Sequence, residues 1–183
     1  RDGLGIIDQA EQINSLAETV TDSGGVMLVP AFTGWGTPHW DPKARGLIIG
    51  LTRDSSKAHI ARSALEGIAL SVATLVDLAK EALGHDLGEL AVDGGASASD
   101  ILLQAQADST GLTIRRPENL ESTAKGIALL AGLENGLIQN VKVHSSAREE
   151  GASYFTPKMD ERSREIWKSN WENAVNRSLN WHE

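Results

Sequence analysis

The sequence predicts an α/β fold in which a mostly parallel sheet is flanked by helices. Short apolar segments alternate with longer ones whose apolar residues recur at helical spacing. The longest helical segment, from about 56 to 83, leaves only a thin polar stripe, which is typical of a central and mostly buried helix. An apolar strand at 90–92 then leads through Gly94 and Gly95 into another helix, as strands and helices join in α/β proteins.

The remaining elements follow from the same periodicities and from turn residues. The expected helices are 4–20, 56–83, 97–110, 122–135 and 158–181. The expected strands are 26–29, 47–51, 90–92 and 112–116. Glycines at 24 and 25 are expected to end the first helix, and Gly136 to follow the end of the fourth. We find no linker or repeat that divides residues 1–183, so we expect one domain.

Composition and charge exclude several classes of protein. The chain has 183 residues, of which 40% are hydrophobic and 23% charged, as in an ordinary globular domain. Its net charge of -8 argues against a general nucleic-acid surface. Cysteine is absent, which excludes disulfides, thiolate metal ligands and a cysteine nucleophile and favours a cytoplasmic location. No apolar run reaches the length of a membrane span, and the absence of Met at position 1 favours a piece of a longer chain.

The segment 92–100 is the strongest candidate for a ligand site. Ser97 is the expected N-cap of the helix, and Asp100 completes an acidic capping box. Gly94 and Gly95 lack the Cβ atoms that would keep a ligand from the backbone. Amides at a helix start have no intrahelical partner, so an anion such as a phosphate is favoured there. The alternative interpretation of the segment is a plain strand-to-helix connection without a ligand. For Asp93 the alternative to a role at the ligand is a carboxylate that accepts local backbone hydrogen bonds.

Other polar residues are interpreted as structural. Histidines 39 and 59 have neither metal-ligand spacing nor an adjoining nucleophile, and His59 fits the first turn of the long helix. Arg62 and Glu66 are four residues apart and are expected to form an ion pair within that helix. Arg115 and Arg116 should point to opposite faces of their strand. Of the tryptophans, those at 35 and 40 are candidates for a partner surface, and those at 167 and 171 for core packing.

Three segments in order carry a resemblance to a known family. They are Val29–Pro42 (VPAFTGWGTPHWDP), Gly46–Arg53 (GLIIGLTR) and Val92–Ala98 (VDGGASA). Together they resemble the C-terminal part of the FGGY carbohydrate kinases, and weaker similarity extends to the end of the chain. The resemblance implies the C-terminal, ATP-side domain of an actin-like (ribonuclease H-like) ATPase fold. That domain would be incomplete, because the N-terminal polyol-binding domain and the first strands of this domain would lie outside the chain.

The same resemblance implies a function and a set of site residues. The family transfers the γ-phosphoryl group of ATP to an alcohol, with Mg²⁺ whose ligands are expected outside this chain. Gly94, Gly95 and Ala96 would approach the nucleotide. Position 99, where the family usually has asparagine, is Ser99 here, a shorter donor and acceptor. No catalytic residue and no metal ligand is assigned to the chain, and alone it is expected to be inactive.

The expected partners are ATP or ADP, the N-terminal domain of the same enzyme, glycerol bound by that domain, and further copies in a homo-oligomer. The Ala31–Gly34 and Asp93–Ala96 segments favour glycerol as acceptor, with a pentulose or another carbohydrate as the alternative within the family. The alternative from another class is a non-catalytic nucleotide-binding or interaction module.

Overall fold

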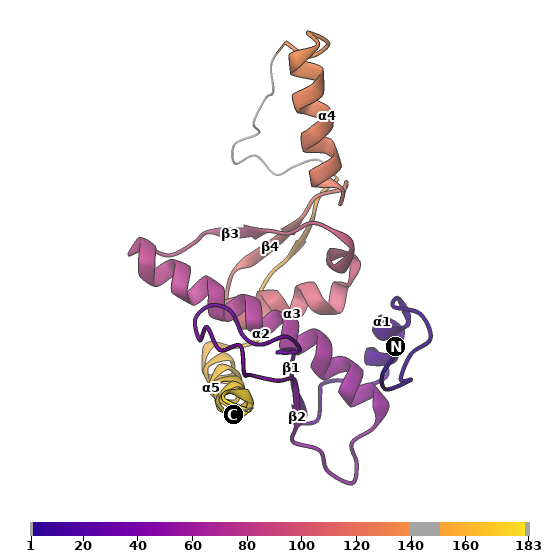
Figure 1. The fold of residues 1–183 in the computed structure, drawn as a ribbon, viewed down its shortest axis with the longest axis vertical. Helices are drawn as coiled ribbons and strands as arrows, with labels where there is room; N and C mark the ends of the chain where they lie inside the picture. Colours follow the sequence, from indigo (N-terminus) through magenta and orange to yellow (C-terminus); the bar gives the residue numbers. More distant parts are fainter. Residues whose placement is uncertain (1, 140–150, 182–183) are drawn as a thin grey trace.

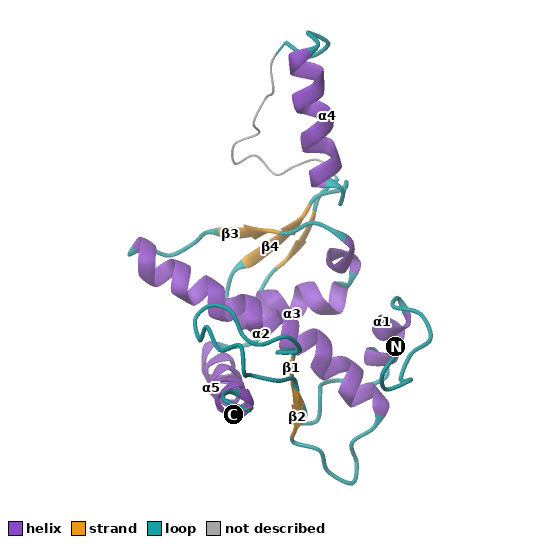
Figure 2. Ribbon diagram, viewed as in Figure 1, coloured by secondary structure: helices purple, strands orange, loops and turns teal. Residues whose placement is uncertain are grey.

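The computed structural model describes residues 2–139 and 151–181, which form two small sheets with helices around them (Figures 1 and 2). The helices are α1 (Gln12–Ala17), α2 (Lys57–Leu83), the 3₁₀ helix η1 (Gly95–Ala98), α3 (Asp100–Thr110), α4 (Ser122–Glu134) and α5 (Glu161–Ser178). The strands are β1 (Met27–Val29), β2 (Leu47–Ile49), β3 (Glu89–Ala91), β4 (Thr113–Arg116) and β5 (Ser153–Phe155). The predicted α/β class is confirmed.

The strands pair less uniformly than a mostly parallel sheet would require. β1 and β2 are antiparallel, β3 and β4 are parallel, and β5 pairs antiparallel with β4. The expectation of a mostly parallel sheet therefore holds only for β3 and β4, which α3 connects as a crossover helix. A loop rather than a helix joins β1 to β2, so β2 runs back along β1. The three-residue β5 was not predicted, because Ser153–Phe155 is not an apolar run like those of β1 and β2 and is too short to show alternation.

The long helix α2 is the centre of the molecule. It packs against α1, α3, α5 and β1, and these elements lie around it in Figure 1. Its predicted start is confirmed: Ser56 is the N-cap, and His59 Nδ1 accepts from the Ser56 amide at 3.1 Å in a capping box. Gly84, at φ 70°, ends the helix. By length and composition α2 could cross a membrane, but half of its most apolar window is buried inside this fold, as in a core helix.

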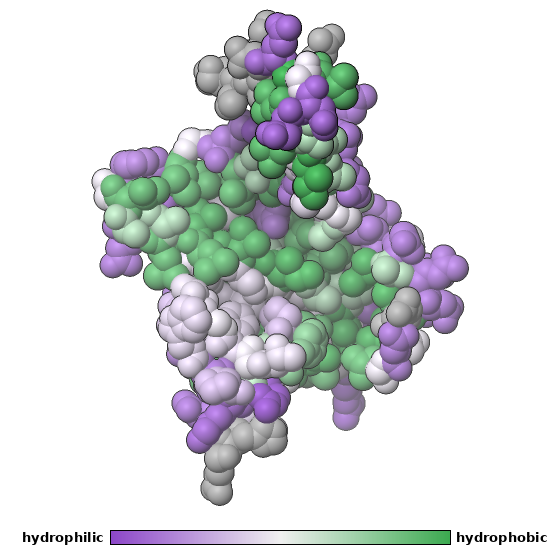
Figure 3. Space-filling model, turned by 45° about the horizontal axis from the view of Figure 1, so that its top comes forward, coloured by the Kyte–Doolittle hydropathy of each residue, from purple (hydrophilic) through white to green (hydrophobic). Residues whose placement is uncertain are grey.

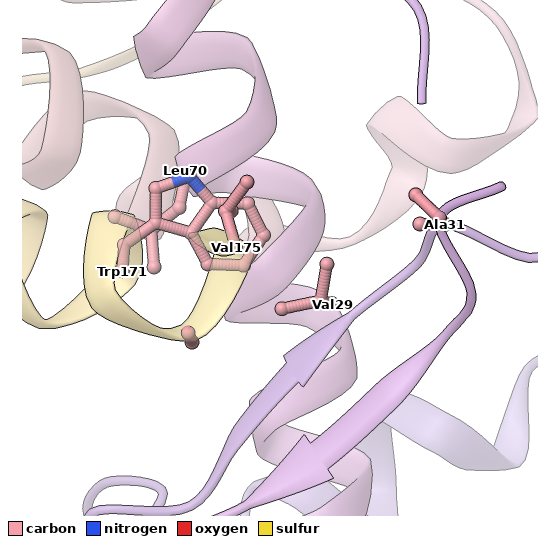
Figure 4. Close-up of a cluster of buried hydrophobic side chains, with 7 residues drawn as sticks. Val29, Ala31, Leu70, Trp171 and Val175 are labelled. Carbon is pink, nitrogen blue, oxygen red and sulfur yellow. The ribbon is translucent and has the colours of Figure 1, made fainter. Parts of the chain in front are cut away.

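Two hydrophobic clusters pack against α2. The first joins β1 to α2 and α5 through Val29, Leu70, Trp171 and Val175 (Figure 4). The second joins α1 to α2 and α3, with Leu65 and Leu102 among its members. Trp167 packs against both clusters and Trp171 is only 3% exposed, so the core packing predicted for these two tryptophans is confirmed.

The first helix is much shorter than predicted. The apolar spacing indicates a helix over 4–20, but α1 covers only Gln12–Ala17. Gly5 has φ 60°, a left-handed conformation that interrupts a helix. The Gln12 side chain accepts from the amides of Asp8 and Gln9 at 2.8 and 3.1 Å, so these donors are satisfied outside a helix.

Helix α4 stands apart from the body at the top of Figure 1. Ile127 and Leu130 on it are 65% and 68% exposed. Gly136, at φ 70°, follows its end as predicted, and the Gly136 amide donates to Leu133 O at 3.1 Å. Figure 3 shows a hydrophobic region across the middle of this face, bordered by hydrophilic residues, so apolar surface is left uncovered there by the described residues.

The predicted pair of Arg62 and Glu66 is present, with Arg62 Nε 2.9 Å from Glu66 Oε1. Glu66 is only 8% exposed, and burial raises its pKa above the ordinary 4.5 although Arg62 and Ser23 act in the opposite direction. Because the pKa of Glu66 is higher in the folded state, the Glu66 carboxyl group binds its proton more tightly there than in the unfolded chain. The stability that this proton provides is therefore complete below pH 4.5 and is lost as pH rises through the folded pKa.

We expect Glu66→Gln to remove the loss of stability that Glu66 causes as pH rises, because glutamine has the shape of the glutamate side chain and cannot ionise. Urea midpoints measured from about pH 4 to about pH 7 test this. The exposed α2 residue Glu81 provides the control, since Glu81→Gln should keep the wild-type slope. A Glu66→Gln protein with the wild-type slope over this range would contradict the assignment.

Candidate functional site: the glycine turn between β3 and α3

The residues between β3 and α3 form a tight turn that we call the glycine turn, residues 92–99. Gly94 has φ 80° and ψ 173°, a conformation that essentially requires glycine, and the 3₁₀ helix η1 follows at once. The Gly94 amide donates to Leu120 O at 2.9 Å, and the Ser97 hydroxyl donates to Gly94 O at 2.6 Å. These bonds fix the path of the turn.

The start of α3 differs from the prediction. Ser97 lies inside η1, and Ser99 is the N-cap, with Ser99 Oγ accepting from the Leu102 amide at 3.2 Å. The prediction of Ser97 as the N-cap was wrong because its hydroxyl bonds back to Gly94 instead. Asp100 remains an acidic residue in the first turn of α3, where it complements the helix dipole.

Two residues of the turn offer open backbone. Gly95 and Ala96 are exposed, and a Cβ added at Gly95 would meet no heavy atom within 4 Å. Amides that open a helix have no partner within it, so those of Gly95 and Ala96 are the natural donors for a ligand. The space beside Gly95 thus fits a group that packs against bare backbone.

Ser99 is placed differently. It is 6% exposed, and its hydroxyl donates to Asn14 Oδ1 at 2.5 Å in addition to capping α3. Its hydrogen-bonding capacity is therefore used to join α1 to α3. The structure brings Gly94, Gly95 and Ala96 together on one turn and turns Ser99 inward, beside Asn14.

A polar hollow of about 420 Å³ lies next to the glycine turn. Its lining comes from the end of β3 and the first residues of the glycine turn, from β4 and the loop after it, and from the start of α4. It consists of Ala91, Val92, Asp93, Arg115, Pro117, Glu118, Asn119, Ser122 and Lys125. Both signs of charge occur around it. Asp93, two residues after the end of β3, is exposed and lines this hollow rather than the core.

The two arginines of β4 point to opposite faces, as predicted. Arg115 Nε lies 2.7 Å from Glu89 Oε1, and Arg116 Nη1 lies 2.7 Å from Asp100 Oδ1. Arg116 also reaches the glycine turn, where its Nη1 donates to Ser97 O at 3.0 Å. Sequence reasoning missed this contact, because Ser97 and Arg116 are 19 positions apart and no local pattern links them.

The other candidates have structural surroundings. The His59 ring lies against Gly24, where an added Cβ would come within 2.9 Å of it. The Trp35 ring packs 6.0 Å from Trp171 and 5.9 Å from His39, so Trp35 belongs to the packing around α5, while Trp40 is 75% exposed. Within residues 2–139 and 151–181, no group of three or more acidic or histidine side chains is arranged to hold a metal ion.

Comparison with known proteins decides the family. Residues 4–134 match the C-terminal domain of the FGGY family of carbohydrate kinases. The chain belongs to the FGGY family. The predicted family and its actin-like α/β fold are therefore confirmed, and the glycine turn lies within the matched part of the FGGY domain.

Several relatives of this FGGY domain are glycerol kinases. The chain is 48% identical over 181 residues to the glycerol kinase of Dechloromonas aromatica and 45% identical to glycerol kinase 2 of Sulfolobus acidocaldarius. These alignments cover 99% of the chain and 36% of each relative, so the chain spans about a third of their length.

Solved structures agree with the sequence comparison. The structure of Plasmodium falciparum glycerol kinase with ADP matches 95% of the chain and 35% of that protein, at a TM-score of 0.83 and 32% identity. A xylulose kinase from Rhodospirillum rubrum has a TM-score of 0.67 at 23% identity and shares the fold.

Proposed function

We propose that this chain is the ATP-side, C-terminal portion of a glycerol kinase, which converts glycerol and ATP to glycerol 3-phosphate and ADP. The observation that carries the proposal is the 48% identity to a glycerol kinase along 99% of the chain. The Plasmodium glycerol kinase was solved with ADP, which supports a nucleotide as the ligand of this domain. The open backbone at Gly95 fits that role.

In this proposal the chain binds and orients the nucleotide. The Gly95 and Ala96 amides donate to it, and the missing side chain at Gly95 lets it approach the backbone. Gly94 sets the direction of these amides through its positive φ and its bond to Leu120 O. Ser99, turned inward, supports the site through Asn14 and the α3 N-terminus instead of through a direct contact.

Phosphoryl transfer needs more than these residues provide. ATP supplies the phosphoryl group, and a positioned hydroxyl, a carboxylate that accepts its proton and Mg²⁺ are required. We assign the acceptor pocket, the base and the Mg²⁺ ligands to a further domain of the same enzyme. Residues 1–183 would then form most of the ATP-side domain, without its first strands, in a homo-oligomeric, cytoplasmic protein.

Other functions are less well supported. The xylulose kinases share the fold, but the identity to the Rhodospirillum enzyme is half that to the Dechloromonas glycerol kinase. A pentulose kinase is therefore not favoured. A non-catalytic module is not favoured either, because close similarity to glycerol kinases extends over the whole chain.

The test is a coupled assay of the complete protein that contains this chain. With ATP and Mg²⁺ present, we expect glycerol to be phosphorylated, and xylulose to be used at least about 100-fold less efficiently by kcat/KM. Residues 1–183 alone should show no activity and weak ADP binding in calorimetry. A complete protein that prefers xylulose would refute the glycerol assignment, and tight ADP binding by residues 1–183 alone would refute the division of the site between domains.

A further inference from the structure

We propose that Arg116 is the positioning residue of the nucleotide site, and that it sets nucleotide affinity by holding the far end of the glycine turn. This inference rests on the proposed function. Its basis is a set of contacts that link Arg116 to the turn, to α3 and to β5 at once.

The Arg116 guanidinium joins the end of the turn to the start of the next helix. Nη1 donates to Ser97 O at 3.0 Å and to Asp100 Oδ1 at 2.7 Å. Nη2 lies 3.5 Å from Ser153 Oγ, and the guanidinium carbon stands 5.2 Å from the centre of the Phe155 ring. The Arg116 side chain is 19% exposed, so its bonds to Ser97 O and Ser153 Oγ are partly shielded from water, whereas the Asp100 side chain is 72% exposed.

The near end of the turn is held by the same segment of chain. Leu120 O accepts from the Gly94 amide at 2.9 Å, only four residues beyond Arg116. Residues 116–120 therefore hold the turn on both sides, at Gly94 and at Ser97. The exposed amides of Gly95 and Ala96 lie between these two points, and their direction depends on both.

Lysine cannot replace arginine at this position. Nη1 of Arg116 makes both short bonds while Nη2 faces Ser153 Oγ, so the planar group is held in one orientation over the Phe155 ring, which the single ammonium nitrogen of lysine cannot reproduce. A loosened Ser97 carbonyl would let the Gly95 and Ala96 amides move and would weaken nucleotide binding in the ground state and the transition state alike. Such uniform loss raises KM for ATP and leaves kcat unchanged.

The experiment compares Arg116→Lys with Arg164→Lys in the complete protein. Arg164 is a matched control because its guanidinium also donates to two carbonyls, Asp108 O at 2.6 Å and Met159 O at 3.1 Å, far from the turn. For Arg116→Lys we expect the KM for ATP and the ADP dissociation constant to rise roughly five- to tenfold. The KM for glycerol and kcat should stay within about twofold of wild type, and Arg164→Lys should leave all four constants within that range.

A second variant keeps the proposal testable if Arg116→Lys fails to fold. Asp100 is 72% exposed at its side chain, so Asp100→Asn should fold, and we expect a two- to threefold rise in both nucleotide constants, about the effect of one weakened contact. Two results would overturn the positioning role. One is that Arg116→Lys and Arg164→Lys have the same KM for ATP and the same ADP dissociation constant. The other is that Arg116→Lys impairs the KM for ATP, the KM for glycerol and kcat equally. A wild-type protein that binds ADP but does not phosphorylate glycerol would instead refute only the proposed substrate.

Discussion

Replacing Gly67 by alanine is expected to lower the free energy of unfolding by about 3 kcal/mol, the upper end of the usual cost of overpacking. Gly67 lies in α2 where the helix crosses β1. A Cβ at this position would stand 2.1 Å from the carbonyl oxygen of Leu28. That oxygen is backbone in a strand paired with β2, so relief requires α2 and β1 to separate.

The matched control is Gly126→Ala in α4. An added Cβ there meets nothing within 4 Å, so alanine should stabilise the helix by roughly 0.5–1 kcal/mol through its higher helix propensity. Thermal or urea unfolding of both variants checks the prediction. If Gly67→Ala were as stable as wild type, the close contact between α2 and β1 would be refuted.

The second large effect is expected at the glycine turn. Gly95→Leu should raise the ADP dissociation constant and the KM for ATP by roughly 10- to 100-fold, which corresponds to about 1–3 kcal/mol of steric cost. The physical reason is that the side chain would enter the space where we place the nucleotide. No protein atom lies within 4 Å of the added Cβ, so the fold itself should tolerate the change.

This makes the binding loss separable from misfolding. The melting temperature of Gly95→Leu should stay within about 2 °C of wild type. Gly88→Leu serves as the control, because Gly88 is exposed and its added Cβ also meets nothing, but it precedes β3 and lies outside the turn. Unchanged ADP affinity in Gly95→Leu would show that the nucleotide does not approach Gly95.

The long periodic elements were readable from the sequence, and the irregular ones were not. The start of α2 was predicted correctly because 27 residues of helical spacing follow a serine that caps them. Helix α1 was predicted too long because the left-handed Gly5 and the Gln12 side chain break a pattern that spacing alone suggests. The antiparallel β5 depends on pairing with a strand 37 residues earlier, which no local pattern encodes.

The same distinction applies to the candidate site. The paired glycines at 94 and 95 mark the turn as a candidate site from residue type alone, because bare backbone there can admit a ligand, but a plain strand-to-helix connection has the same local pattern. The choice between Ser97 and Ser99 as the N-cap could not be made this way, since both are serines and a short 3₁₀ turn decides between them. The contacts from Arg116 and Asn14 join residues 19 and 85 positions apart, so only the folded chain shows them.

We propose that the glycine turn receives the nucleotide of an ATP-dependent kinase. The most direct test is a crystal structure of the complete protein with ADP. We expect ADP within van der Waals contact, about 4 Å, of the Gly95 and Ala96 backbone, with the Arg116 bonds to Ser97 and Asp100 intact. ADP bound elsewhere on the domain, with the turn unoccupied, would contradict it.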